Sequence, residues 1–134
     1  MAKTEKRRPP SPPRGAGGGS LPSQIDRALT AADSKKAVDL VVLDLRQVAG
    51  FTDFFVICSG TNTRQVRAIA DAVIEALADA GAKPAHLEGY DRSEWVLIDY
   101  FDFVVHVFSP DTRQFYGLER LWGSAERIEV PATS

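Results

Sequence analysis

The stretch EWVLIDYFDFVVHVF, residues 94–108, decides the fold of this chain. It holds two runs of aliphatic and aromatic residues joined by only Phe101 and Asp102, a pattern typical of an antiparallel β-hairpin. A two-residue connection fixes the register, so Tyr100 faces Phe103 across the turn. The same face carries two further apolar pairs, Ile98 with Val105 and Val96 with Val107. Because this face is wholly apolar, we expect it to belong to the hydrophobic core.

The opposite face of the hairpin is mixed. It pairs Asp99 with Val104, Leu97 with His106 and Trp95 with Phe108. If a helix covered this face, its polar groups would need buried partners, because each unsatisfied group costs about 1–3 kcal/mol. We therefore expect an open face on which Trp95 is a docking residue, since Trp is enriched among interface hot spots. The alternative is a Trp95 side chain packed beneath the last helix.

The segments before the hairpin predict a first helix and three strands. The helix is expected from Ser23, with Asp26 at the spacing of a capping box, to about residue 36. A Val-rich run at residues 38–45 and a second, mostly apolar run at 53–59 predict two strands, and a weaker strand follows at 85–88.

Two further helices complete the pattern. Asn62 and Gln65 repeat the capping spacing ahead of an apolar stripe of helical period, which ends at Gly81. A last helix is expected at 110–123, and its large side chains should pack on the sheet: Phe115, Tyr116, Leu118, Leu121 and Trp122, of which Tyr116 or Trp122 could also reach a partner. A strand, a helix and a strand around residues 60–88 form a crossover. We therefore expect an α/β (α+β) fold, with a mixed, mostly five-stranded sheet covered by helices.

The length and charge of the chain limit its organisation. Of the 134 residues, 1–22 are rich in Pro, Gly and basic residues and are expected to be a disordered tail, 23–123 a folded domain and 124–134 a C-terminal tail. Residues 1–24 have a net charge of +4, whereas residues 25–134 have a net charge of −6. The acidic domain argues against direct sequence-specific binding of nucleic acid, which needs clustered Lys and Arg. Its expected partner is basic.

The composition also excludes several classes of protein. No apolar run approaches the roughly 20 residues that cross a bilayer, and the N-terminus lacks a secretory signal. The single Cys58 cannot form an intramolecular disulfide, and one Cys with two His makes no zinc site without carboxylates. We expect a cytoplasmic protein without membrane contact, metal or cofactor.

Nucleotidyl transfer is the catalytic chemistry to weigh. It would need two carboxylates on one face of a strand to hold Mg²⁺. Asp99 and Asp102 are three residues apart across the turn and cannot share such a face. Ser59, Gly60 and Thr61 precede a helix N-terminus that could cradle a phosphate, but the lysine and second glycine of a P-loop are absent. Capping and a tight turn explain these residues better, and we expect no catalytic residue.

Three ordered motifs carry a resemblance to a known family. They are FTDFFVICSGTNTRQVRAIADAV at 51–73, EGYDRSEWVLIDYFDFVVHVF at 88–108 and FYGLERLWG at 115–123. Over residues 23–123 the chain resembles the ribosomal silencing factors, the RsfS or Iojap family. The resemblance implies a nucleotidyltransferase-like fold without the catalytic residues. It also implies binding to large-subunit ribosomal protein fourteen where the small subunit would join, which blocks subunit association and translation when nutrients are scarce.

The resemblance also suggests where the partner binds. The family motif places the contact at Trp95, with Asp99, Tyr100 and His106 as the other motif positions, and Leu97 faces His106 in our register. The register sends Tyr100 to the core face, whereas the motif places it near the contact. The family usually has glycine where this chain has Phe101, a turn position that can require a positive φ. The side on which Tyr100 lies therefore depends on the turn.

Two functions of different classes follow. The leading hypothesis is a non-enzymatic translation repressor that binds the large ribosomal subunit through protein fourteen and excludes the small subunit sterically. The alternative is a nucleotidyltransferase-like nucleotide-binding enzyme that uses the Gly60 turn and Asp99. A homodimer that pairs the open faces and hides Trp95 is a third hypothesis, so we expect a monomer or a weak homodimer.

Overall fold

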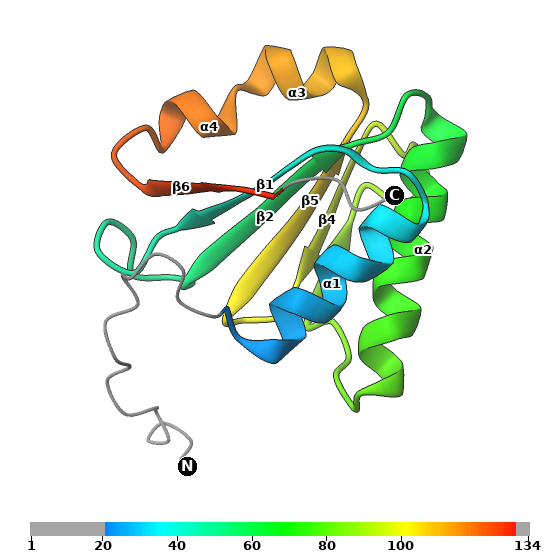
Figure 1. The fold of residues 1–134 in the computed structure, drawn as a ribbon. Helices are drawn as coiled ribbons and strands as arrows, with labels where there is room; N and C mark the ends of the chain where they lie inside the picture. The colour runs from blue at the N-terminus through cyan, green and yellow to red at the C-terminus, as the bar shows by residue number, and fades with distance from the viewer. Residues whose placement is uncertain (1–20, 131–134) are drawn as a thin grey trace.

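A mixed β-sheet runs through the structure, a computed structural model that describes residues 21–130 (Figure 1). The strands are β1 (Val38–Asp44), β2 (Phe54–Ser59), β3 (His86–Glu88), β4 (Trp95–Asp99), β5 (Phe103–Phe108) and β6 (Glu126–Glu129); the helices are α1 (Ser23–Ser34), α2 (Thr63–Asp79), α3 (Pro110–Tyr116) and α4 (Leu118–Leu121). All but the last two residues of the predicted tail 1–22 lie outside the described residues. Within 21–130, no helix is long and apolar enough to span a membrane.

The strand order is β3-β4-β5-β2-β1-β6. β2 and β5 pair in parallel, and the other neighbours pair antiparallel. The mixed sheet is therefore confirmed, but it has six strands. β6 lies in segment 124–134, which we expected to be a tail. We expected no strand there because the sequence ERIE has alternating charges and no apolar run that would mark a strand. It forms because the backbone of β1 offers a free edge with which it pairs.

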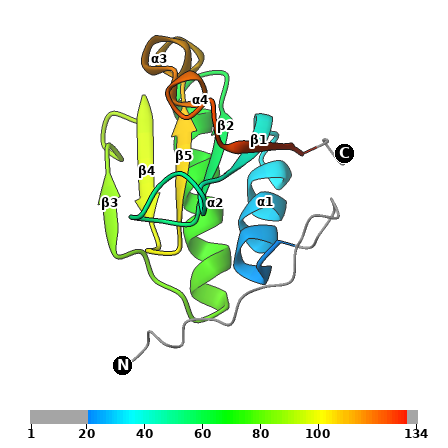
Figure 2. The ribbon, with the colours of Figure 1, turned by 90° about the vertical axis from the view of Figure 1, so that its left-hand side faces the viewer.

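α1 and α2 lie side by side on one face of the sheet, as both views show (Figures 1 and 2). The apolar stripe of α2 is fully buried there, at Val66, Ile69, Ala70, Val73 and Leu77. It meets the face of the hairpin that we predicted to be core, including Val96, Ile98, Val105 and Val107. The apolar face that the helical period gives α2 and the apolar face that alternation gives the strands thus pack together in one core.

The register of the β4–β5 hairpin is confirmed: Trp95 pairs with Phe108, Leu97 with His106 and Asp99 with Val104. The backbone N–H of Tyr100 also donates to the carbonyl of Phe103 at 2.9 Å, so the turn contains only Phe101 and Asp102. Phe101 has φ +72°, the conformation that favours glycine. Two side chains fix this turn, because Thr52 donates to the Phe101 carbonyl at 2.7 Å and Asp99 accepts from the Phe101 N–H at 2.8 Å.

The two predicted helix caps differ in outcome. Asn62 caps α2 by accepting a hydrogen bond from the backbone N–H of Gln65 at 2.9 Å, as predicted. The Gln65 side chain in turn accepts from the N–H of Thr61. At α1 the prediction is wrong: Ser23 is the first helical residue, and the cap is Pro22, whose carbonyl accepts the N–H groups of Ile25 and Asp26.

The single last helix that we predicted for 110–123 is wrong in one respect. Gly117 adopts the left-handed conformation with φ +56° and divides the segment into α3 and α4. A side chain would strain this conformation, whereas glycine adopts it freely. The break allows the chain to pass along one end of the sheet and return as β6 (Figure 1).

Candidate partner-binding surface

The second face of the sheet carries a cluster of aromatic side chains, which we call the aromatic face. Its members are Phe51, Phe55, Trp95, His106, Phe108, Tyr116 and Trp122, linked to one another by ring contacts. Within residues 21–130, α3 and α4 are the helices on this side, and they lie across one end of the strands (Figure 2). The face is therefore partly covered and is less open than the sequence predicts.

Trp95 lies half-buried in the aromatic face, where three rings contact it. Its ring stacks on Phe108 with 5.0 Å between centroids, and Tyr116 of α3 lies 4.7 Å away. The indole Nε1–H donates to Nδ1 of His106 at 3.0 Å. The hypothesis of an open face and the alternative of a Trp95 packed beneath the last helix are thus each partly correct. Trp95 contacts the last helical segment and still keeps part of its surface exposed. An indole fixed in this way loses little side-chain entropy on binding a partner.

His106 is the buried hydrogen-bond partner of Trp95. Its side chain is buried, with 3% of the residue exposed, and the ring of Phe55 meets it edge-on with 4.4 Å between centroids. Burial lowers the pKa of His106 to about 3, so the imidazole is neutral at pH 7. Because Nδ1 accepts the indole hydrogen bond, the ring proton is on Nε2, which has no partner among the described residues. His106 therefore positions the indole of Trp95.

The loop before β4 is tied to α2 by Arg67. Its guanidinium donates to the Ser93 hydroxyl at 3.1 Å and to the Asp91 carbonyl at 2.6 Å, and it lies 5.0 Å from the ring centroid of Tyr90. The Tyr90 hydroxyl donates to Asp71 of α2 at 2.7 Å. These contacts hold in place the segment that leads into Trp95. Arg67 falls on the polar side of the sequence pattern of α2, and no local pattern indicates this role.

Leu97 and Asp99 lie on the same side of the sheet as Trp95, as the register predicts, and both are half-buried. The carboxylate of Asp99 accepts the N–H of Phe101, so it also stabilises the turn. On the neighbouring edge strand, Glu88 faces Leu97 and His86 faces Asp99. Their exposed side chains, which are hydrogen-bonded to each other, place a polar rim beside the aromatic face.

Tyr100 lies on the other face of the sheet. It is 8% exposed, stacks on Phe103 with 5.0 Å between centroids, and belongs to the core beneath α1 and α2. Burial raises the pKa of its hydroxyl to about 12. Tyr100 therefore lies on the core face, as the register predicts, and does not share a surface with Trp95, Leu97, Asp99 and His106.

The exposure of several large apolar side chains differs from what the sequence predicts. Phe115 and Leu121 were expected to pack on the sheet, but they are 77% and 71% exposed. Leu118 and Trp122 do pack on this side, as expected. Phe51, which the sequence analysis did not consider, is 61% exposed and contacts Phe55 and Trp122. The sequence did offer a signal for Phe51: it is a large aromatic residue next to Gly50, in the segment that separates two predicted strands.

The features that would serve catalysis have structural roles here. The N–H groups of Gly60 and Thr61 are hydrogen-bonded within the chain, to the Phe108 carbonyl and the Gln65 side chain. Cys58 is buried, and burial raises the pKa of its thiol to about 12. Within residues 21–130, no group of three or more His, Cys, Asp and Glu side chains is placed to hold a metal ion.

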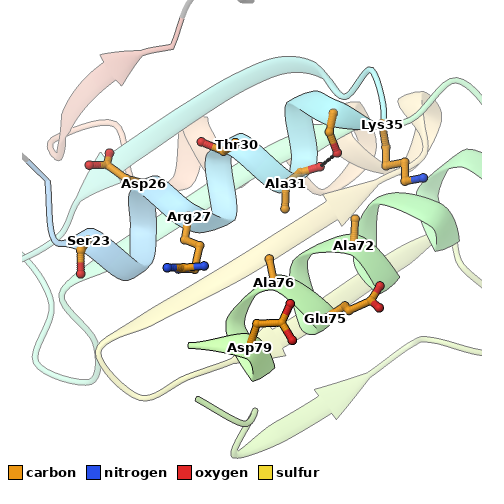
Figure 3. Close-up of a pocket in the computed structure, with 11 residues that line it drawn as sticks. Ser23, Asp26, Arg27, Thr30, Ala31, Lys35, Ala72, Glu75, Ala76 and Asp79 are labelled. Carbon is orange, nitrogen blue, oxygen red and sulfur yellow. Dashed lines mark hydrogen bonds between the residues drawn. The ribbon is translucent and has the colours of Figure 1, made fainter. Parts of the chain in front are cut away.

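Two hollows lie away from Trp95. One is a shallow groove of about 630 Å³ between α1 and α2, with Ala31, Ala72 and Ala76 along its floor and charged side chains such as Arg27, Glu75 and Asp79 at its rim (Figure 3). The other is a cavity of about 500 Å³ at the end of β2, next to α3 and α4.

Comparison with known proteins decides the family. Residues 19–134 match the family described as "Ribosomal silencing factor during starvation". The chain belongs to this family. The ribosomal silencing factor RsfS of Halalkalibacterium halodurans is 44% identical over 106 residues, which cover 79% of this chain and 91% of that protein. A crystal structure of a protein from Chromobacterium violaceum superimposes with a TM-score of 0.74 at 33% identity, covering 84% of this chain and 94% of that one.

The family also extends beyond bacteria. A mouse protein named "Mitochondrial assembly of ribosomal large subunit protein 1" is 31% identical over 101 residues, which cover 73% of this chain and 44% of that protein. The resemblance to ribosomal silencing factors and the α+β fold expected from the sequence pattern are therefore confirmed. Membership connects the chain with ribosome-related regulation of translation, and the names of its relatives are those of a regulatory family.

Proposed function

We propose that this chain binds the large ribosomal subunit through large-subunit ribosomal protein fourteen and represses translation by keeping the small subunit away. The aromatic face is the proposed docking surface and Trp95 its anchor. The observation that carries this proposal is the fixed, half-exposed indole of Trp95, which His106 holds by a hydrogen bond at 3.0 Å. A preorganised Trp within an aromatic cluster is typical of an interface hot spot.

Charge and relatives support the same partner. Residues 25–134 have a net charge of −6, and Glu88 stands beside Leu97 at the rim of the aromatic face. Such a surface attracts a basic ribosomal protein and is repelled by bare RNA. The mouse relative is named for the ribosomal large subunit, which is consistent with this choice. The proposed mechanism is occupancy of a surface, without catalysis or a cofactor, by a monomer or weak homodimer in the cytoplasm.

The test is co-sedimentation of the purified chain with isolated large ribosomal subunits, beside small subunits as a control for non-specific binding. We expect binding to large subunits alone. Trp95→Ala should reduce the affinity at least 30-fold, because losing a hot-spot side chain costs about 2 kcal/mol or more. Trp95→Phe, which keeps the stacking on Phe108 but loses the hydrogen bond to His106, should give an intermediate loss.

A matched control removes an exposed aromatic side chain away from the aromatic face. Phe101 is 72% exposed in the hairpin turn, and Phe101→Gly should bind like the unchanged protein. Circular dichroism and thermal unfolding establish that each variant is folded. A folded Trp95→Ala variant that binds large subunits with full affinity would refute the docking surface, and no binding of the unchanged protein to either subunit would refute the function.

A further inference from the structure

The β3–β4 loop, residues 89–94, has an unusual backbone conformation. Gly89 has φ +78° and Ser93 has φ +56°, a region that a residue with a side chain adopts only at an energetic cost. Ser93 is also buried, with 1% of the residue exposed, so contacts with the surrounding chain hold it in this conformation. Strained residues that are held in this way occur where a fold keeps a functional group in a fixed position.

Two backbone contacts join this loop to the aromatic face. At Gly89 an added Cβ would clash with the carbonyl oxygen of Trp95, so the loop packs directly against the start of β4. At the other end of the loop, the carbonyl of Glu94 accepts the N–H of Ser109, the residue before α3, at 2.8 Å. α3 carries Tyr116, whose ring centroid lies 4.7 Å from that of Trp95. The loop therefore contacts the first residue of β4 and the start of α3, the two elements whose rings meet at Trp95.

Arg67 of α2 makes the side-chain contacts that fix the loop. Its Nε–H donates to the Ser93 hydroxyl at 3.1 Å, and its Nη2 donates to the carbonyls of Asp91 at 2.6 Å and Tyr90 at 3.3 Å. The Ser93 hydroxyl in turn donates to the carbonyl of Tyr90 at 2.7 Å. One guanidinium thus binds three residues of the loop through its planar fork of donors, a geometry that the single ammonium of lysine lacks.

Loss of this guanidinium should loosen the loop without unfolding the domain. Arg67 is an exposed residue, so its removal leaves no cavity in the core. Two other bonds of the loop would remain, from the Ser93 N–H to the Gly89 carbonyl at 2.9 Å and from the Tyr90 hydroxyl to Asp71 at 2.7 Å. The effect of Arg67 is therefore expected to be local.

We propose that Arg67 is a positioning residue of the docking surface. From α2, on the opposite face of the sheet, it holds the β3–β4 loop, and through this loop it holds the start of β4 with Trp95 and the start of α3 with Tyr116. Arg67 acts through these rings and does not itself bind the partner. Its effect on ribosome binding rests on the function proposed above, whereas its effect on Trp95 does not.

The first experiment measures hydrogen exchange at the indole Nε1–H of Trp95 by NMR, in the full chain labelled with ¹⁵N. The spectrum of Trp95→Phe assigns this signal, and the hydrogen bond to His106 slows its exchange in the unchanged protein. Arg67→Ala should speed the exchange about tenfold, because the lost charge-assisted hydrogen bonds no longer oppose local opening. The backbone amide of Ile57, in the central strand β2, should keep its rate. Equal acceleration of both signals would mean a general loss of stability and would overturn the proposal, and so would an unchanged indole.

The matched control for charge is Arg64→Ala. Arg64 is an exposed arginine of the same helix, and its side chain has no hydrogen bond or ion pair within residues 21–130. The substitution removes the same charge and should leave the indole exchange unchanged. Arg67→Lys keeps the charge but loses the fork, so its indole should exchange as in Arg67→Ala. Equal effects of Arg64→Ala and Arg67→Ala, or full protection in Arg67→Lys, would show that charge and not position is the cause and would refute the proposal.

The second experiment is co-sedimentation with large ribosomal subunits. Arg67→Ala should weaken binding about tenfold, less than Trp95→Ala does, because the indole is still present. Arg64→Ala should bind like the unchanged protein. Full affinity of Arg67→Ala, together with loss of binding in Trp95→Ala, would overturn the proposal and leave the proposed function intact. If the unchanged protein bound neither subunit, the proposed function would fail, and the indole exchange would still decide whether Arg67 positions Trp95.

Discussion

At the residue scale, the buried His106 affects the stability of the fold and also positions Trp95 of the proposed docking surface through a hydrogen bond. The imidazole is buried with a pKa of about 3, far below its ordinary value of 6.5. The folded protein therefore binds fewer protons than the unfolded chain between these two values, and its stability falls as the pH falls below 6.5. The loss is about 1.4 kcal/mol per pH unit from this one group.

This linkage predicts the behaviour of a variant without the imidazole. Between pH 6.5 and 5, the free energy of unfolding of the unchanged protein should fall by about 2 kcal/mol more than that of His106→Gln, measured by urea denaturation. His86 is an exposed histidine on edge strand β3, and His86→Gln should keep the full pH dependence. If His106→Gln kept it too, the buried imidazole would not be its source.

Phe101 has a strained backbone conformation. Its φ of +72° costs a non-glycine residue about 1–3 kcal/mol. Glycine avoids this strain but adds chain entropy to the unfolded state, worth about 0.5–1 kcal/mol. We predict that Phe101→Gly raises the free energy of unfolding by about 1 kcal/mol in chemical denaturation. Asp102→Gly, one residue on and without a positive φ, should lower it; the opposite order would show that the turn is not strained.

At the scale of elements, local patterns predicted those parts that local physics determines. The β4–β5 register follows from alternation and a two-residue connection, and α2 follows from its apolar period and the Asn62 cap. β6 and the break at Gly117 could not be predicted in this way. A glycine within a helical pattern is often tolerated, and ERIE becomes a strand only because β1 presents an unpaired edge.

The same limit applies to the candidate site. Alternation placed Trp95, Leu97, Asp99 and His106 on one side and Tyr100 on the other, and the structure has them so. The burial of His106 and the exposure of Phe115 depend on where α3 and α4 lie. That placement rests on long-range contacts such as the one from Arg113 to Ser59, which no local pattern contains.

β6 provides the test at this scale. Ile128 and Val130 pack against the core, and Arg127 binds Glu119. A chain that ends after Gly123 leaves β1 as an unpaired edge, so its free energy of unfolding should fall by about 3 kcal/mol, from lost apolar burial and backbone hydrogen bonds. Thermal and urea unfolding measure this loss. A chain that ends after Val130 is the control, and equal stability of the two shortened chains would mean that β6 adds nothing.

At the scale of the whole molecule, the two sides of the sheet differ in composition. The side beneath α1 and α2 contains the larger core cluster, with no exposed aromatic side chain among its members. The other side combines a smaller core with the aromatic face, and its exposed rings lie within an acidic domain. On the proposed docking surface, we expect the aromatic anchor to slow dissociation and the overall charge to speed association.

This division predicts how salt acts on binding to the large subunit. If the acidic domain docks on a basic protein, raising the salt concentration should lower the association rate constant, because screening weakens the long-range attraction. The dissociation rate constant should change little, whereas Trp95→Ala should raise it. Surface-immobilised large subunits allow both constants to be measured from about 50 to 300 mM salt, a range over which the screening length falls substantially. An acidic domain that approached ribosomal RNA would be repelled at low salt and would associate faster as salt rises. The sign of the salt effect therefore distinguishes a basic protein from RNA as the surface on which the aromatic face docks.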